Sequence, residues 1–249
     1  MPIFEARNLF KSFGGLKAID DLSFSMKGRT ITSLIGPNGA GKTTVFSLIT
    51  GFLKPDTGSI FFKGREITGV APFRIVQSGI ARTFQDVRIL GRLSVLENIL
   101  VGTKETHRLT LLGSLLWRRG LRKKMMDRVH RIMEHFKLDG IAGKLAEDVS
   151  YAEQKLIILA RALATDPELL LLDEPASGLD QVSIEKMMGL LRDLVDQGKT
   201  VFLVEHNMDV VINVSDYVVV LDFGRKIAEG VPEKIRNDEK VLQAYLGAA

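Results

Sequence analysis

The chain has 249 residues, of which 45% are apolar, enough to bury a sizeable core and too many for global disorder. It contains no cysteine, which excludes a disulfide framework and a thiolate metal site. The formal net charge is +4, which is compatible with nucleic acid, an anionic membrane surface or no specific partner. The N-terminus lacks the apolar region of a signal peptide, and the apolar runs are too short to cross a bilayer. We therefore expect a soluble or peripheral protein.

Alternating apolar and polar residues over the first 65 positions predict strands and hairpins. Among them, the apolar run Ile31–Ile35 leads directly into the sequence GPNGAGKTT. A strand, a glycine-rich turn and then a helix is the context in which G-x-x-x-x-G-K-[ST] binds nucleotide phosphates, with the lysine at the β- and γ-phosphates and the hydroxyl on Mg²⁺. Lys42 and Thr43 are these two residues. The predicted loop consists of Gly36, Pro37, Asn38, Gly39, Ala40, Gly41, Lys42, Thr43 and Thr44.

From about Ser94 to Leu145 the pattern changes to helical periodicity. Five residues repeat at i, i+3/i+4 spacing and predict a helix face turned to the core: Met125, Val129, Ile132, Met133 and Phe136. A basic cluster precedes them, formed by Arg118, Arg119, Arg122, Lys123 and Lys124. Nucleic-acid binding would be better supported by interleaved aromatic residues, and only Trp117 is close by. We interpret the cluster as a solvated helix face and expect no nucleic-acid partner.

Short apolar runs at 169–172 and 201–204, with helical segments between them, predict buried parallel strands. Residues 218–221 and 224–230 predict a terminal hairpin, and a helix is expected over 233–246. The predicted fold class is α/β, a nucleotide-binding core with a parallel sheet and a helical insertion between about residues 90 and 160.

Two carboxylates, Asp173 and Glu174, follow the strand at 169–172. In an open α/β sheet the carboxyl ends of the strands line the ligand crevice, so both acids are expected to face the phosphates. Asp173 is then the expected outer partner of Mg²⁺, and Glu174 the base that aligns and deprotonates a water molecule. His206, just after the strand at 201–204, can donate a hydrogen bond to the γ-phosphate in this context.

Taken together and in this order, these residues resemble the ATPase subunit of ABC transporters over essentially the whole chain. The resemblance implies a P-loop core with an N-terminal antiparallel β subdomain at 1–88 and 160–249, and a helical subdomain at about 89–159 that carries the signature. It implies that Gln85 links Mg²⁺ and water to the helical subdomain. The other implied roles are adenine stacking by Phe13, the D-loop acid at Asp180, the switch histidine at His206, and a signature at Ser150–Glu153 that binds the ATP of the opposite subunit.

Within that family the chain is similar to importer ATPases for branched-chain amino acids, a group with relatives serving urea and amides. The stretches that carry this similarity are 13–18, 48–51, 79–85, 94–98 and 244–247, with the insertion at 110–124. The similarity implies ATP and Mg²⁺ as ligands, a second ATPase subunit stacked head to tail, two membrane permeases and, indirectly, a solute-binding protein. The permeases would dock near 85–98, which places the chain in the cytoplasm on the inner face of the membrane.

One residue departs from the subfamily pattern. Where the signature usually reads LSYGEQ, this chain reads VSYAEQ, so Ala152 replaces a glycine. Alanine disfavours positive φ, at a cost of about 1 kcal/mol if that φ is required, which predicts a somewhat weaker signature. Two alternatives to transport stay open from the residues alone: an ABC ATPase that serves as an assembly scaffold, and a paralogue that binds ATP and scarcely turns it over. The transported substrate and the choice between homodimer and heterodimer also stay open.

Overall fold

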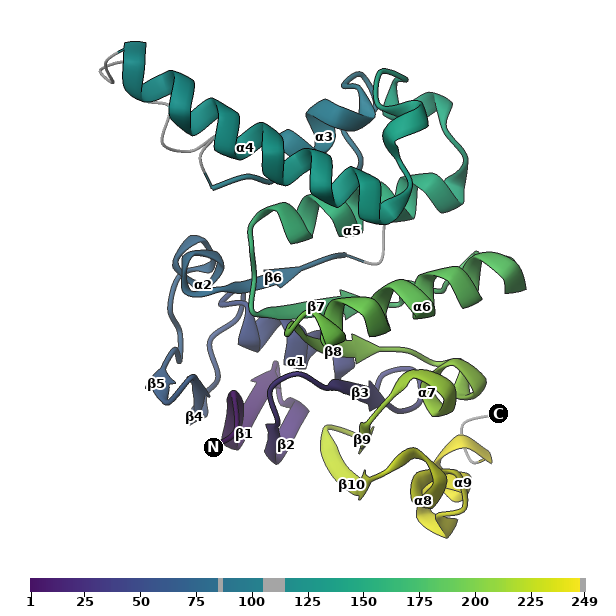
Figure 1. The fold of residues 1–249 in the computed structure, drawn as a ribbon. Helices are drawn as coiled ribbons and strands as arrows, with labels where there is room; N and C mark the ends of the chain where they lie inside the picture. The colour runs from purple at the N-terminus through teal and green to yellow at the C-terminus, as the bar shows by residue number, and fades with distance from the viewer. Residues whose placement is uncertain (85–86, 105–114, 247–249) are drawn as a thin grey trace.

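The computed structural model describes residues 1–84, 87–104 and 115–246. In these residues the strands form two sheets, one of four and one of six strands (Figure 1). The four-stranded sheet is antiparallel, with the order β2-β1-β4-β5, and it confirms the predicted N-terminal β subdomain. Its strands are β1 (Phe4–Phe13), β2 (Leu16–Met26), β4 (Thr57–Phe62) and β5 (Arg65–Glu66).

The six-stranded sheet has the order β10-β9-β3-β8-β7-β6. Its neighbours from β9 to β6 are parallel, and β10 pairs antiparallel with β9 as the predicted terminal hairpin. The strands are β3 (Ile31–Ile35), β6 (Ile80–Arg82), β7 (Leu169–Asp173), β8 (Thr200–Val204), β9 (Tyr217–Asp222) and β10 (Arg225–Gly230). The carboxyl ends of β3, β7 and β8 therefore meet at one edge of the sheet, which is where ligands bind in such folds.

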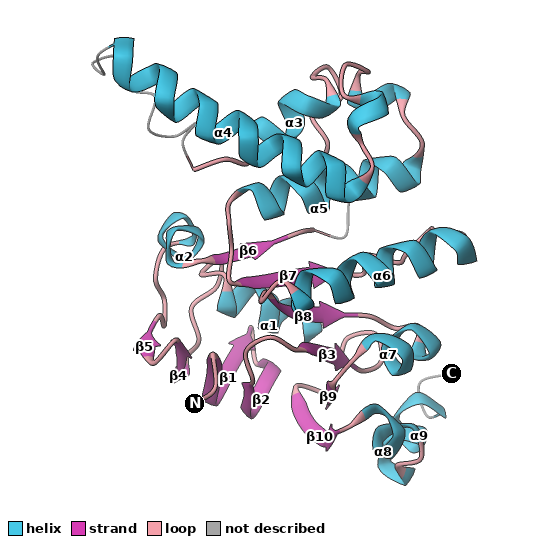
Figure 2. Ribbon diagram, viewed as in Figure 1, coloured by secondary structure: helices cyan, strands magenta, loops and turns pink. Residues whose placement is uncertain are grey.

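Helices pack against the six-stranded sheet, and a helical lobe lies beside β6 (Figure 2). The helices at the sheet are α1 (Lys42–Ile49), α2 (Pro72–Ser78), α6 (Gln181–Asp196) and α7 (Met208–Val214). The lobe contains α3 (Val95–Val101), α4 (Leu115–Phe136) and α5 (Tyr151–Ala164), with short 3-10 turns at Asp139–Ile141 and Ala146–Asp148. None of the described helices is long and apolar enough to span a membrane.

Both faces of the six-stranded sheet are buried, because successive residues of a strand point to opposite sides. Leu170 and Leu172 of β7 belong to a core cluster with residues of α5 and α6, whereas Leu169 and Leu171 belong to a second cluster with Phe46 of α1. This two-sided burial explains why the strand sequence is apolar without alternation. The carboxylate of Asp173 comes at the end of that strand, where the apolar core stops.

The long helix α4 confirms the predicted core face. Val129, Ile132, Met133 and Phe136 are buried in the cluster shared with α5, and Met125, the fifth predicted residue, is half-buried. Its side chains at 122–124, which carry part of the predicted basic cluster, are exposed. The side chains of Arg118 and Arg119 lie outside the described residues.

The single C-terminal helix predicted over 233–246 is wrong. Two helices occupy the segment, α8 (Pro232–Arg236) and α9 (Glu239–Leu246). The break occurs at Asp238, whose carboxylate accepts hydrogen bonds from the backbone N–H groups of Lys240 and Val241 and thereby caps α9. A local side-chain cap of this kind overrides the helical periodicity of the apolar residues.

Candidate functional site

The phosphate loop, residues 36–44, connects the carboxyl end of β3 to the N-terminus of α1. Gly36 and Gly41 are required there by both conformation and space. Gly36 has φ +151°, and a Cβ on it would lie 2.1 Å from the carbonyl oxygen of Leu221. Gly41, the N-cap residue of α1, has φ +103°, and its Cβ would lie 2.6 Å from the carbonyl oxygen of Ala18. The loop is thus held between β2 and β9, with the first turn of α1 at its base, where backbone N–H groups lack intrahelical partners and favour an anion.

Lys42 folds back over this loop. Its Nζ donates hydrogen bonds to the carbonyl oxygens of Gly36, at 2.7 Å, and Pro37, at 2.8 Å. Burial lowers the pKa of Lys42, while the charges of Glu174 and Asp173 oppose that shift. The ammonium group therefore lies in the field of both predicted acids, and the structure brings loop and acids together as expected.

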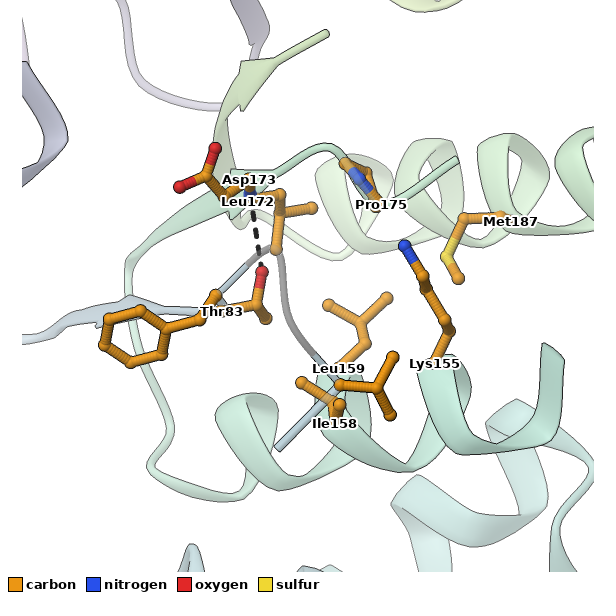
Figure 3. A pocket seen from close by; sticks show the side chains of 10 residues that line it. Thr83, Lys155, Ile158, Leu159, Leu172, Asp173, Pro175 and Met187 are labelled. Carbon is orange, nitrogen blue, oxygen red and sulfur yellow. Dashed lines mark hydrogen bonds between the residues drawn. The ribbon is translucent and has the colours of Figure 1, made fainter. Parts of the chain in front are cut away.

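Asp173 ends β7 as a buried carboxylate and pairs with Arg82 of the neighbouring strand β6. The distance from Arg82 Nη2 to Asp173 Oδ2 is 3.0 Å, and each side chain is only 7% exposed. Burial raises the pKa of Asp173, and the hydrogen bond from Arg82 opposes the rise. The backbone N–H of Asp173 points at the hydroxyl of Thr83, 3.4 Å away (Figure 3). Sequence reasoning did not identify Arg82 as part of the site. The signal that the sequence offered was its position, a charged residue directly after the two apolar residues 80 and 81.

We predict that Arg82→Met destabilises the fold by about 3 kcal/mol, because removing one partner of a buried pair leaves the other charge uncompensated. Urea unfolding of the purified chain measures this loss. The double variant Arg82→Met, Asp173→Asn removes both charges and should recover most of the stability. If the double variant loses as much free energy of unfolding as the two single variants do together, the two residues are not coupled.

Glu174 has an unusual backbone conformation, with φ +47°, and its main chain is held on both sides. Its N–H donates to the carbonyl oxygen of Val204 at 2.9 Å, and its own carbonyl oxygen accepts from Lys155 Nζ at 3.0 Å. Positive φ in a residue other than glycine marks strain that surrounding contacts must stabilise, and such strain gathers at functional sites. Glu174 Oε1 lies 3.5 Å from Nδ1 of His206, a side chain that is 57% exposed. The structure thus joins the predicted base to the predicted switch histidine.

The oxygen donors near the loop fit Mg²⁺. Thr43 is exposed in the first turn of α1, and Asp173 supplies a carboxylate at the adjacent strand end. No group of three or more His, Cys, Asp or Glu side chains that could hold a metal ion occurs in the described part of the chain. Mg²⁺ in nucleotide sites takes one or two protein oxygens, water and the substrate phosphates, and Thr43 and Asp173 are oxygen donors of this kind. Gln85, the third predicted metal residue, lies outside the described residues.

Ser150 is the N-cap of α5 and forms a capping box with Glu153. Ser150 Oγ accepts from the N–H of Glu153, and the Glu153 carboxylate accepts from Ser150 N–H at 2.8 Å and from its hydroxyl at 2.7 Å. Among the described residues, no hydrogen bond or ion pair joins Ser150 to the phosphate loop of the same chain. The signature hydroxyl is therefore held at a helix N-terminus, where positive partial charge favours an anion.

The strain expected at Ala152 is absent. Ala152 is the second residue of α5, and it is not among the described residues with positive φ. The helix begins at Tyr151, two residues earlier than a left-handed position at 152 would allow, because Ser150 and Glu153 cap it. The penalty predicted from the missing glycine therefore does not apply to this conformation.

We now predict that Ala152→Gly destabilises the chain by about 1 kcal/mol, since glycine loses more backbone entropy than alanine inside a helix. ATP turnover of the assembled protein should not rise. Thermal unfolding and turnover measured on the same preparation test both parts. A variant that is faster than the parent would restore the original interpretation of a weakened signature.

The remaining predicted residues occupy separate positions. Asp180 is the exposed N-cap of α6 and accepts from Ser183 N–H at 2.9 Å, and this bond lowers the pKa of Asp180. Phe13 ends β1, is 45% exposed and packs under Lys11 Nζ.

Comparisons with known proteins agree with this geometry. The family model described as ABC transporter matches residues 19–177, and a model described as branched-chain amino acid ATP-binding cassette transporter matches residues 225–249. The high-affinity branched-chain amino acid transport ATP-binding protein LivG of Salmonella typhimurium is 38% identical, over 100% of this chain and 99% of its own. BraF of Pseudomonas aeruginosa, described in the same words, is 38% identical over the same shares.

Solved structures show the same fold. A nucleotide-free ATP-binding cassette from an ABC transporter superposes with a TM-score of 0.86 at 35% identity, covering 98% of this chain and 99% of its own. A cassette in its ADP conformation gives a TM-score of 0.87 at 33% identity, covering 99% of each chain. With the phosphate loop, the paired acids and the signature helix in place, the chain belongs to the ABC transporter family of ATP-hydrolysing, nucleotide-binding proteins.

Proposed function

We propose that this chain is the ATP-hydrolysing subunit of an importer for branched-chain amino acids. The observation that carries the proposal is the end-to-end match at 38% identity to LivG and BraF, together with the branched-chain transporter model at residues 225–249. Urea or amides, the substrates of related importers, are the competing cargo. The transported substrate is selected in other subunits, so the cargo is inferred from the relatives and not from this site.

The proposed chemistry uses the residues around the phosphate loop. Lys42 leaves its two loop carbonyls to bind the β- and γ-phosphates of ATP, which is a gain because the ammonium group exchanges neutral carbonyl acceptors for anionic phosphate oxygens. Glu174 accepts a proton from the attacking water, and His206 donates a hydrogen bond to the γ-phosphate. Thr43, Asp173 and Gln85 would hold Mg²⁺, which neutralises charge on the phosphates when it is bound.

A second ATPase subunit completes each site in this proposal. The chain carries one phosphate loop and one signature, and Ser150 is exposed, with its side-chain bonds in the described part of the chain made to Glu153. In a head-to-tail pair, Ser150 and Ala152 would meet the ATP held by the other subunit, with Asp180 at the same junction. We retain, as part of the proposal, the division into a core (1–88 and 160–249) and a signature-bearing lobe (about 89–159).

The permease contact is proposed at the junction of α2, α3 and α5. A groove of about 260 Å³ opens there, lined by apolar and cationic side chains that include Val76, Phe84, Arg88, Val101 and Arg161. Phe73 of α2, 61% exposed, extends the apolar surface. An exposed apolar surface with a charged rim suits a partner helix, and docking here would hold the chain peripherally on the inner face of the membrane.

Co-purification from membranes tests the proposal. A tagged chain, solubilised in mild detergent, is expected to bring two different permeases and a second ATPase subunit. The matched control carries Phe73→Asp with Val101→Asp, which should release the permeases and leave ATP binding unchanged. Recovery of soluble partners without permeases would contradict the transport function and favour the scaffold alternative.

A further inference from the structure

The peptide segment that follows β7 is fixed by three separate contacts around Glu174. Besides the bonds of Glu174 to Val204 and Lys155, the N–H of Ala176 donates to Oε1 of Glu205 at 2.9 Å. Glu205 is 1% exposed, and it lies directly before His206. Burial raises the pKa of Glu205, and the bond from Ala176 opposes the rise. The base is therefore positioned by groups that do not themselves reach the phosphates.

Lys155 is the one of these groups that belongs to the helical lobe. It comes from α5, is 7% exposed, and extends toward the segment of Asp173 and Pro175 (Figure 3). A cavity of about 20 Å³, room for about one water molecule, lies beside it between α5 and the end of β7. Burial lowers the pKa of Lys155, while the charges of Glu205 and Glu174 oppose that shift. The buried ammonium group of Lys155 lies among two carboxylates and a carbonyl oxygen. These partners are needed, because an unpaired charge buried there would be costly.

The same helix carries the signature. Ser150 caps α5, and Tyr151, its first residue, lies one turn before Lys155 with its ring centre 5.6 Å from Lys155 Nζ. The Tyr151 ring also packs against Gly178, where a Cβ would lie only 3.0 Å from it. A helix moves as a rigid element, so any displacement of Ser150 and Tyr151 carries Lys155 with it. The contact of Lys155 with the Glu174 carbonyl then changes too.

We propose that Lys155 is a positioning residue that couples the signature of this subunit to the orientation of its own Glu174. When the signature binds the ATP of the opposite subunit, α5 is drawn into place, and Lys155 sets the Glu174 peptide so that the carboxylate can reach its water. The two ATP sites are thereby linked through one side chain that touches neither nucleotide. This inference rests on the proposed role of Glu174 as the base.

The test compares Lys155→Met, which keeps the stem and removes the ammonium group, with Lys155→Arg, which keeps a cation. Both are assembled with the permeases and the second ATPase subunit, and ATP turnover is measured. We expect Lys155→Met to lower kcat at least about tenfold with KM for ATP within about twofold, because misplacing a catalytic group costs rate rather than binding. Lys155→Arg should recover most of the rate. Lys234→Met, an exposed lysine of α8, is the matched control and should match the parent.

A second comparison separates coupling from mere stability. Lys155→Met with Glu205→Gln removes both buried charges and keeps an oxygen for the Ala176 N–H. We expect this pair to regain the parental melting temperature while kcat stays low; recovery of kcat along with the melting temperature would overturn the proposal.

In the same assay, Ser150→Ala combined with Lys155→Met should be no slower than the slower single variant, because both interrupt one pathway. If the losses in kcat of the two single variants multiply in the double variant, the proposed coupling is wrong.

Failure of the proposal is distinct from failure of the base assignment. If Glu174→Gln keeps its turnover, the assignment of Glu174 is wrong whatever Lys155 does. If Glu174→Gln is inactive while a stably folded Lys155→Met has the parental kcat, the positioning role of Lys155 is wrong.

Discussion

Glu174→Gln is expected to lower the ATP turnover of the assembled protein by at least about 100-fold, since a positioned general base contributes 10²–10⁴ to the rate. Glutamine keeps the size of the side chain and loses the ability to accept a proton. ATP binding should be retained, because Glu174 has no part in the phosphate loop. The expected product is an ATP-bound pair of ATPase subunits that does not reopen, which size-exclusion chromatography with bound-nucleotide analysis can detect.

The matched control is Glu168→Gln, an exposed glutamate directly before the first residue of the same strand. Its carboxylate pairs with Lys63 at the surface, at 2.6 Å with both side chains about half exposed, so turnover should not change. Unchanged turnover in Glu174→Gln would remove Glu174 from the role of base and leave His206 as the next candidate.

Gly36→Ala is expected to destabilise the chain by about 3 kcal/mol or more and to abolish ATP binding. The added Cβ would lie 2.1 Å from the carbonyl oxygen of Leu221, so the loop or strand β9 must move. Gly39→Ala is the matched comparison in the same loop. Gly39 also has positive φ, +80°, but its Cβ would meet nothing within 4 Å, so only a conformational cost of about 1 kcal/mol is expected.

Thermal unfolding and nucleotide binding of the two variants measure the difference. If Gly36→Ala and Gly39→Ala lose the same stability, the contact of the loop with β9 is not what requires glycine at position 36. The comparison therefore separates backbone freedom from close approach as the reason for a glycine.

The sequence predicted those parts of the site whose residues directly follow a recognisable strand in the chain. The loop at 36–44 follows its strand directly, and Asp173 and Glu174 end an unbroken apolar run, so both patterns indicate their place at the edge of a parallel sheet. His206 could be placed in the same way, because it follows the neighbouring strand β8. Its 3.5 Å approach to Glu174 agrees with that reasoning.

The parts that could not be predicted depend on contacts between distant segments. Arg82 reaches Asp173 only because β6 and β7 are neighbours in the sheet, and 91 positions separate the two residues in the chain. In the sequence, nothing distinguishes Lys155 and Glu205 from other charged residues, because their burial depends on the tertiary fold. Ala152 was misinterpreted for the opposite reason: a family pattern suggested a left-handed residue, whereas the local capping box of Ser150 and Glu153 places it inside a helix.

Transport by the complete assembly is the most direct test of the proposed function. Vesicles containing the chain, its permeases and the second ATPase subunit are loaded with ATP, and radiolabelled leucine is added outside with the solute-binding protein. We predict ATP-dependent uptake of leucine that isoleucine and valine inhibit, and no uptake when the chain carries Glu174→Gln. Uptake unaffected by Glu174→Gln, or an assembly that hydrolyses ATP without accumulating any of these amino acids, would contradict the account.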